Sequence, residues 1–288
     1  MLRAAEKEES AEIGRNDLSH LKLRVITKLN HFIEYDESQR TAGVTCHFGS
    51  RNFGLKVCQY WMKQAKTPFG KSELREKISE FKKSWNGPKT ELKGAIDKFM
   101  EGLTKDHIQG YLKGPKLSGY LCDMCLAQLY AQYNHKTVHG IIKDILRGYG
   151  IKVTSEIMTT HNYIDLEDRT LRKSSVRAAS GETFLVPFNM RDGIAICKGL
   201  GNPEWLESCS HGAGRKLSRS KAKDTLSLEE FKETMKDVYS TTVCRGTIDE
   251  SPMAYKDTEE IKRLILETCD ITEFLVPKIN IKASDGGD

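Results

Sequence analysis

The stretch Ser208-Cys-Ser-His-Gly-Ala-Gly-Arg-Lys-Leu-Ser-Arg219 places a histidine, His211, directly before a run of small residues and two arginines. Glycines at 212 and 214 relax the steric limits on the backbone, so that successive N–H groups can approach a ligand closely. Arg215 and Arg219 follow, and backbone donors beside arginine are typical of a phosphate site. His211 then lies where a nucleophile or proton-transfer group facing a phosphate would act. A glycine turn with a surface histidine is the alternative interpretation.

The composition is that of a globular protein with a sizeable core, since 38% of the 288 residues are hydrophobic and 30% are charged. The 45 basic residues nearly balance the 40 acidic ones, and the net charge of +5 permits an anionic partner without pointing to nucleic acid. No run is as long and apolar as a transmembrane helix, and the charged first residues do not resemble a signal peptide. We therefore expect a cytoplasmic protein with no membrane partner. The eight cysteines are expected to be reduced thiols.

The spacing of apolar residues and turns predicts an α+β fold in a single domain, residues 1–288, with a mixed sheet and a mostly helical segment at about 54–150. Strands are expected at 23–29 and 43–47, around a turn-like segment at 36–40, and then at 151–157, 172–177, 183–187, 193–197 and 274–281. Helices are expected at 227–239 and about 258–269, the first of them capped by Ser227, three residues before Glu230.

Four of the eight histidines end a predicted strand or lie in a glycine turn, namely His31, His47, His161 and His211. Because His31 closes one predicted strand and His47 the next, adjacent strands could present two imidazoles side by side. Imidazole is a common ligand for zinc, manganese and iron. Together with the two turns that combine glycine and arginine, the set predicts a site for metal and phosphate.

Several motifs follow one another along the chain in an order that resembles one family. They are NHFIE at 30–34, HFGSRNFG at 47–54, HN at 161–162, Pro187 to Met190, GN at 201–202, HGAGR with SR at 211–219, DESPMAYKD at 249–257 and IK at 281–282. From about residue 20 to its C-terminus the chain is similar to the RtcB-type RNA-splicing ligases. The joint pattern of HxGSRxxG and HGAGRxxSR is highly specific for that family.

The resemblance implies an RtcB-like ligase domain that uses GTP and Mn²⁺ to join RNA 3′-phosphate or 2′,3′-cyclic phosphate ends to 5′-hydroxyl ends. His211 would carry GMP as a phosphoramidate, and the partners would be RNA ends, such as tRNA halves, with an archease-like activator as a further candidate. The implied metal ligands are His31, His47 and His161, and the implied RNA phosphate-binding residues are Arg51 and Arg219. The implied GTP-binding residues are Asn30, Phe32, Glu34, Asn162, Pro187, Asn189, Gly212, Ala213, Gly214, Arg215, Tyr255 and Lys282, with Lys282 reading the guanine edge.

The sequence departs from the family pattern at the metal ligands. The family carries an aspartate and a cysteine in a D-x-x-C-G motif in its N-terminal part, and because no such motif is found here, the chain is expected to be truncated at that end. Cys46 is a poor substitute, because neighbours on a strand point to opposite faces. A hard cation prefers an anionic ligand. Smaller departures are RKSSVR at 172–177, where the family has RKGATR, and Asn189, where it has serine.

These departures leave four interpretations open. The chain is a compact, divergent ligase; or a C-terminal piece that needs a second polypeptide to supply the missing metal ligands; or a degenerate relative that binds GTP or RNA without ligation; or a structural module. An enzyme predicts guanylylation of His211, whereas a binding module predicts nucleotide or RNA affinity without a covalent adduct.

Overall fold

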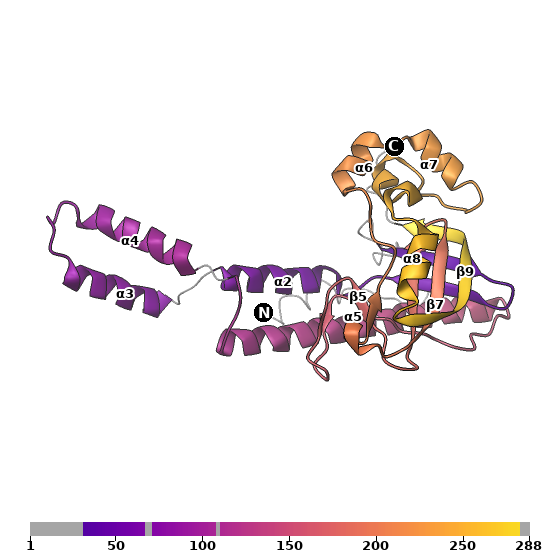
Figure 1. The fold of residues 1–288 in the computed structure, drawn as a ribbon, viewed down its shortest axis with the longest axis horizontal. Coiled ribbons are helices and arrows are strands. Elements are labelled where there is room, and N and C mark those ends of the chain that lie inside the picture. Colours follow the sequence, from indigo (N-terminus) through magenta and orange to yellow (C-terminus); the bar gives the residue numbers. More distant parts are fainter. Residues whose placement is uncertain (1–30, 67–70, 108–109, 283–288) are drawn as a thin grey trace. The chain divides into compact units, whose positions relative to one another are not determined.

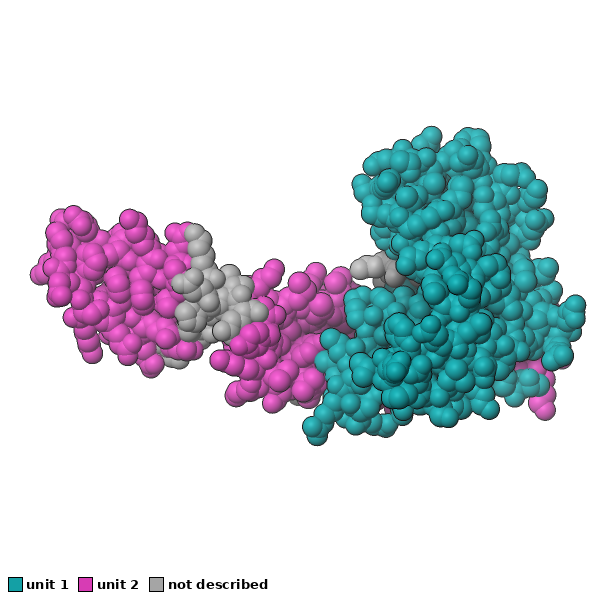
Figure 2. Space-filling model, in the orientation of Figure 1, with its two compact units in different colours: residues 1–48, 154–288 teal, residues 49–153 magenta. Residues whose placement is uncertain are grey.

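The computed structural model describes residues 31–66, 71–107 and 110–282, which form two compact units (Figure 2). One unit combines residues 1–48 with 154–288 and contains every strand described, and the other spans residues 49–153 and is helical. The predicted α+β class is confirmed. The helical unit coincides closely with the helical segment expected at about 54–150. That the two units form one domain stays a prediction.

The first unit is built on a five-stranded antiparallel sheet with the order β2-β1-β9-β7-β6. The C-terminal strand β9 lies in its centre and pairs with β1 on one side and β7 on the other, so it joins an N-terminal hairpin to a hairpin from the middle of the chain (Figure 1). The strands are β1 Phe32–Glu37, β2 Ala42–His47, β6 Thr183–Asn189, β7 Gly193–Gly199 and β9 Cys269–Lys282.

Short elements surround this sheet. Two small sheets pair β3 (Tyr163–Ile164) with β4 (Leu171–Arg172), and β5 (Ser175–Arg177) with β8 (Ser208–Ser210). The α-helices are α6 Arg219–Thr225, α7 Leu228–Thr234 and α8 Thr258–Ile265, and the 3-10 helices are η2 Pro203–Trp205, η3 Arg245–Glu250 and η4 Pro252–Ala254. The Ser227 side chain accepts a hydrogen bond from the backbone N–H of Glu230, which confirms the predicted cap.

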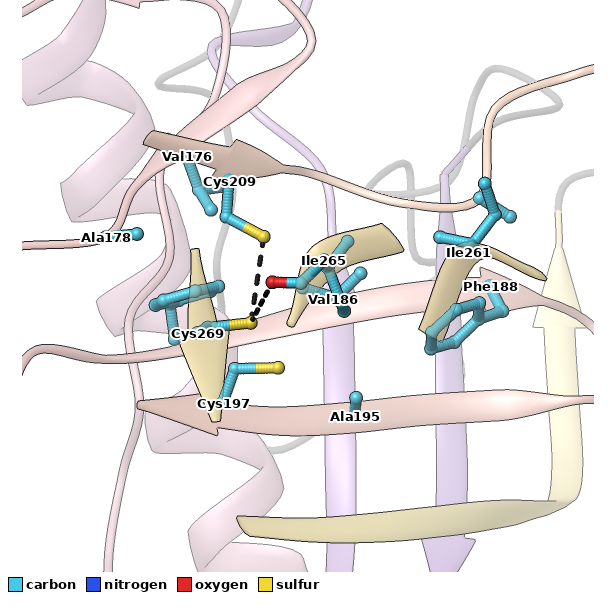
Figure 3. Close-up of a cluster of buried hydrophobic side chains, with 12 residues drawn as sticks. Val176, Ala178, Val186, Phe188, Ala195, Cys197, Cys209, Ile261, Ile265 and Cys269 are labelled. Carbon is cyan, nitrogen blue, oxygen red and sulfur yellow. Dashed lines mark hydrogen bonds between the residues drawn. The ribbon is translucent and has the colours of Figure 1, made fainter. Parts of the chain in front are cut away.

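The core of this unit lies between β6, β7, the β5–β8 pair and helix α8 (Figure 3). Strand β6 alternates buried and half-buried residues, and Phe184, Val186 and Phe188 point into the core. Three buried cysteines from three strands meet there, and the Sγ atoms of Cys209 and Cys269 lie 3.9 Å apart. All eight cysteines are free thiols, as predicted. A second cluster packs Phe231 of α7 against the residues around η3.

The helical unit consists of two helix pairs. The pairs are α2 (Arg51–Ala65) with α5 (Pro115–Gly148), and α3 (Lys71–Ser84) with α4 (Leu92–His107). Trp61 contacts Tyr120 in the first pair, and the rings of Phe81 and Phe99 stack at 4.3 Å in the second. In the described part of the chain, no helix combines the length and the apolar character needed to cross a bilayer.

Four sequence predictions differ from the structure or fall outside it. The strand expected at 23–29 lies outside the described residues. The segment at 36–40, predicted as a turn, begins inside β1, because Asp36 and Glu37 continue the ladder opposite Gly43 and Ala42. Residues 151–157 form no strand, since this largely exposed segment has no partner strand. Helices α7 and α8 end at Thr234 and Ile265, earlier than predicted.

Gly193, at the start of β7, provides a test of the central sheet. Its φ of +99° is disfavoured for other residues, and a Cβ there would lie 2.0 Å from the carbonyl oxygen of Leu275 in β9. Gly193→Ala should therefore lower the free energy of unfolding by about 2 kcal/mol or more, measured by urea denaturation. Gly43→Ala is the matched control, because its Cβ would make an ordinary 3.6 Å contact with the Leu275 side chain. Equal unfolding free energies for the two variants would contradict the tight β7–β9 contact.

Candidate functional site

Three histidine rings gather in the first unit although they are far apart in the sequence. His47 ends β2, His161 lies in the segment before β3, and His211 follows β8. The ring centroids are 5.1 Å apart for His47 and His161 and 4.5 Å apart for His161 and His211. His31, directly before β1, is close enough to lower the pKa of both His47 and His161, after the larger effect of burial. The structure thus brings together the histidines that the sequence singled out.

The ring of His211 is held by a main-chain carbonyl. Its Nδ1 atom lies 2.9 Å from the carbonyl oxygen of Ser174, and a carbonyl can only accept, so Nδ1 carries the proton. The Nε2 atom therefore presents its lone pair. Burial has the largest effect and lowers the pKa of His211; the hydrogen bond to Ser174 raises it, and the charge of Lys173 lowers it again, so that the net shift is downward. The result is a neutral imidazole with a defined tautomer, as a nucleophile requires.

Ser174 and Asn162 link His211 to the other two histidines. The N–H of Ser174 donates to Asn162 Oδ1 at 2.7 Å, so the amide nitrogen of Asn162 faces His161 Nδ1, also at 2.7 Å. Both residues have positive φ angles, +57° at Ser174 and +59° at Asn162. Such strained backbone persists only where surrounding contacts hold it, and it often marks a functional site. Ser174 was missed from the sequence, although it lies in the RKSSVR segment that departs from the family pattern.

Arg172 braces the loop that carries Ser174. Its guanidinium is fully buried and forms ion pairs with Asp165 at 3.0 Å and Asp168 at 2.6 Å. Its Nε also donates to Ser208 Oγ at 3.0 Å, in the strand that precedes His211. A buried guanidinium that divides its N–H donors among three residues fixes geometry better than a lysine would. The segment before β5 is thereby tied to β8.

The metal prediction can be tested on the distances between these rings. The Nε2 atoms of His47 and His161 lie 3.3 Å apart, and two imidazoles bound to one cation, each at about 2.1 Å, have a similar separation. Burial lowers the pKa of His161 to about 4, which keeps it neutral as a metal ligand must be. Among the described residues, however, no group of three His, Cys, Asp or Glu side chains is arranged to hold a metal. His47 and His161 are therefore placed as two ligands of one metal ion, and the described residues do not complete the ligand set.

Cys46 does not complete that set. Its thiol is largely buried, which raises its pKa to about 12, and among the described residues it joins no metal-binding group with the histidines.

A second group of site residues surrounds the end of β9. Lys282 pairs with Phe32 across the β1–β9 ladder, and its Nζ lies 5.1 Å from the centre of that ring and 3.5 Å from Glu250 Oε2. Two residues earlier, the Asn280 side chain donates to Glu34. Burial lowers the pKa of Lys282, whereas burial and the neighbouring Asp36 raise the pKa of Glu34. Phe32, Glu34 and Lys282, predicted from distant motifs, are thus neighbours.

Two of the three predicted site arginines, Arg215 and Arg219, form ion pairs with buried carboxylates. Arg215 donates to the carbonyl oxygens of Leu217 and Asp249 and lies 3.4 Å from Glu250, and its guanidinium lies 5.1 Å from the Tyr255 ring. Arg219 lies 2.5 Å from both Asp249 and Glu250. These pairs connect the segment after His211 to η3.

The remaining predicted residues take several positions. A Cβ on Gly212 would come within 2.8 Å of the Pro187 carbonyl oxygen, so the glycine segment packs closely on β6, and Ala213 is buried beside it. Asn189 is engaged in its own turn, with bonds to Arg191 and Asp192. Asn30 lies outside the described residues. Arg51 begins helix α2 in the helical unit.

Asp36 gives this site a measurable pH dependence. Burial raises its pKa from 3.8 to about 6, so the folded chain binds a proton that the unfolded chain has already released. The tighter proton binding by folded Asp36 contributes fully to the free energy of unfolding below about pH 4, and this contribution is lost as the pH rises to about 6. For a pKa shift of about two units, the free energy of unfolding of the wild type should fall by about 3 kcal/mol between pH 4 and pH 7. Asp36→Asn should remove this fall, which is checked by measuring the unfolding free energy of both proteins at the two pH values. Identical pH profiles for wild type and variant would refute this assignment.

Comparison with known proteins identifies the family. Residues 25–283 match the family model described as tRNA-splicing ligase RtcB. The chain is 32% identical over 251 residues to the RNA-splicing ligase RtcB of Escherichia coli K12, covering 81% of this chain and 54% of that protein. It is 36% identical over 275 residues to the RNA-splicing ligase RtcB of Mycobacterium tuberculosis (81% and 57%) and 25% identical over 292 residues to the tRNA-splicing ligase RtcB of Nanoarchaeum equitans (85% and 56%). The chain thus spans about half the length of these curated relatives. It belongs to the RtcB family.

Proposed function

We propose that this chain carries the nucleotide-transfer centre of a GTP-dependent RNA ligase, which joins RNA 3′-phosphate or 2′,3′-cyclic phosphate ends to 5′-hydroxyl ends. The observation that carries the proposal is the hydrogen bond from His211 Nδ1 to the Ser174 carbonyl, beside a glycine segment and two arginines. It leaves Nε2 as a neutral nucleophile next to groups suited to phosphate. Family membership and the names of the relatives support the same activity.

In this proposal His211 Nε2 attacks the α-phosphorus of GTP, an N–P bond forms, and pyrophosphate leaves with the electrons of the broken P–O bond. The RNA 3′-phosphate oxygen then attacks the same phosphorus, and the N–P bond returns its electrons to Nε2. The 5′-hydroxyl oxygen loses its proton and attacks the activated RNA phosphate, releasing GMP. Arg215 and Arg219 would balance the phosphate charges during these steps.

A divalent cation such as Mn²⁺ would be held by His47 and His161, with His31 as a further candidate ligand. It would supply neutralisation of phosphate charge at the reacting ends. Both rings are kept neutral by burial, as their lowered pKa values indicate. Ligands from outside the described residues are needed to complete the set.

A second candidate function follows from that incomplete ligand set. In this alternative the chain is a fragment or degenerate relative that binds GTP or RNA and needs a partner polypeptide for ligation, or has lost it. The two candidates share the nucleotide side of the site and differ in the metal side. RNA ends, including tRNA halves, are the proposed substrates in the first, and an archease-like activator is a further proposed partner.

The test is the intact mass of the purified chain after incubation with GTP and manganese, read at neutral pH because phosphoramidates are acid-labile. A GMP adduct should form on His211 and be absent in His211→Ala, while His135→Ala, a change in helix α5, should retain it. Because the pKa of His211 is lowered from 6.5, the rate should fall little between pH 7 and pH 6.5. An adduct that persists in His211→Ala would refute the assignment. A folded wild type without an adduct would favour the partner-dependent alternative.

A further inference from the structure

The carboxylate of Glu250 is nearly fully buried, with 1% of the residue exposed, at the last position of η3. It touches four side chains, each of which belongs to the set assigned above to GTP or RNA phosphate. These contacts are to Tyr255 Oη at 2.7 Å, Lys282 Nζ at 3.5 Å, Arg219 Nη1 at 2.5 Å and Arg215 Nη1 at 3.4 Å. No other role for Glu250 follows from the proposed reaction.

Glu250 divides its two oxygens between two groups of partners. Oε2 accepts from Tyr255, which directly follows η4, and from Lys282, which ends β9. Oε1 faces Arg215 and Arg219, which follow the glycine segment after His211. Because a carboxylate is planar and rigid, and this one is buried, the position of one group sets the position of the other.

The charge of Glu250 is also needed locally. Lys282 is only 7% exposed, and a buried ammonium requires a counterion. The other nearby carboxylate, Glu34, accepts a hydrogen bond from Asn280 and neighbours the carboxylate of Asp36. Its raised pKa favours the protonated, neutral form. The Glu250 carboxylate, with Oε2 at 3.5 Å from Nζ, is the ion-pair partner of Lys282.

We propose that Glu250 is a positioning residue, which holds Lys282, the predicted reader of the guanine edge, and its neighbour Tyr255 in register with the phosphate-facing pair Arg215 and Arg219. The proposal rests on the function proposed above, which gives Arg215 and Arg219 their role, and on the GTP-binding positions that the family resemblance implies for Tyr255 and Lys282. Glu250 itself reaches the nucleotide only through them. A nucleotide selected by Lys282 would be presented with its α-phosphate at a fixed place relative to the arginines and His211.

Two variants separate this role from simple core packing. Glu250→Gln keeps the volume but turns an N–H₂ donor toward either Lys282 or the arginines, whereas Glu250→Ala leaves a cavity. Glu259→Gln, on the exposed face of α8, is the matched control for loss of one carboxylate. The GTP-over-ATP preference in adduct formation should fall at least tenfold in Glu250→Gln and stay unchanged in the control. Loss of folded protein alone would lower both rates equally and leave the ratio unchanged, and that result would overturn the proposal.

A double variant tests whether the effect passes through Lys282. Lys282→Met should lower the same preference, and Glu250→Gln should add little to it in the double variant, because residues that act as one unit are not additive. Independent, additive losses would contradict a shared role.

Backbone hydrogen exchange measures whether Glu250 couples the two segments, and it needs no nucleotide. It therefore tests this proposal independently of the proposed function. In Glu250→Gln, exchange should become at least tenfold faster in both 213–219 and 279–282, with β6 and β7 unchanged. Faster exchange in one segment only, or in none, would overturn the positioning role. The two proposals can therefore fail separately. If the wild type forms no GMP adduct but Glu250→Gln still speeds exchange in both segments, the proposed function is refuted and the structural coupling through Glu250 stands.

Discussion

The pairing of β9 with β1 depends on buried polar contacts rather than on the usual burial of apolar residues. At the end of β9, Asn280 is 1% exposed whereas its neighbour Ile281 is 42% exposed. A slip of one residue would exchange these faces and bring the isoleucine inside. Two polar contacts oppose this slip, the hydrogen bond from Asn280 to Glu34 and the ion pair of Lys282 with Glu250. In the slipped register each of these buried polar groups would lose its partner. The chemistry of the site thus sets the register of the strand that carries it.

The histidine side of the site depends on a different device, which is backbone strain held by buried hydrogen bonds. His161 and His211 lie on segments without long strands, so neither is placed by the central sheet alone. Their positions are fixed through Asn162 and Ser174, both in the left-handed region, and through the buried Arg172 beneath them. Main-chain groups therefore set the tautomer of His211, independently of most side-chain identities nearby.

The sequence predicted much of this fold because its signals were local. Helical spacing marked the 49–153 unit, short apolar runs among glycine turns marked β6 and β7, and Ser227 capped its helix. The pattern misled where tertiary contacts decide: residues 151–157 alternate but find no partner strand, and Asp36 looks like a turn residue yet lies buried in β1. The histidines and arginines were recognisable from their glycine neighbours. Glu250 and Asn280 were not, because an acid or amide gives no local sign that it will be buried against a lysine or a carboxylate.

The two sides of the site differ in how complete they are within the described residues. On the nucleotide side the charges are paired internally: Glu250 faces Lys282, Arg215 and Arg219, and Asp249 faces Arg219. Such a network is ordered before any ligand arrives, which lowers the cost of binding. On the metal side, two imidazoles converge, and no further His, Cys, Asp or Glu among the described residues joins them in a metal-binding group. The Mn²⁺ proposed above is a hard cation, which prefers an anionic ligand. In the proposed reaction, nucleotide binding would depend on residues that this chain supplies, whereas metal-assisted joining of RNA ends would depend also on ligands that the described residues do not provide.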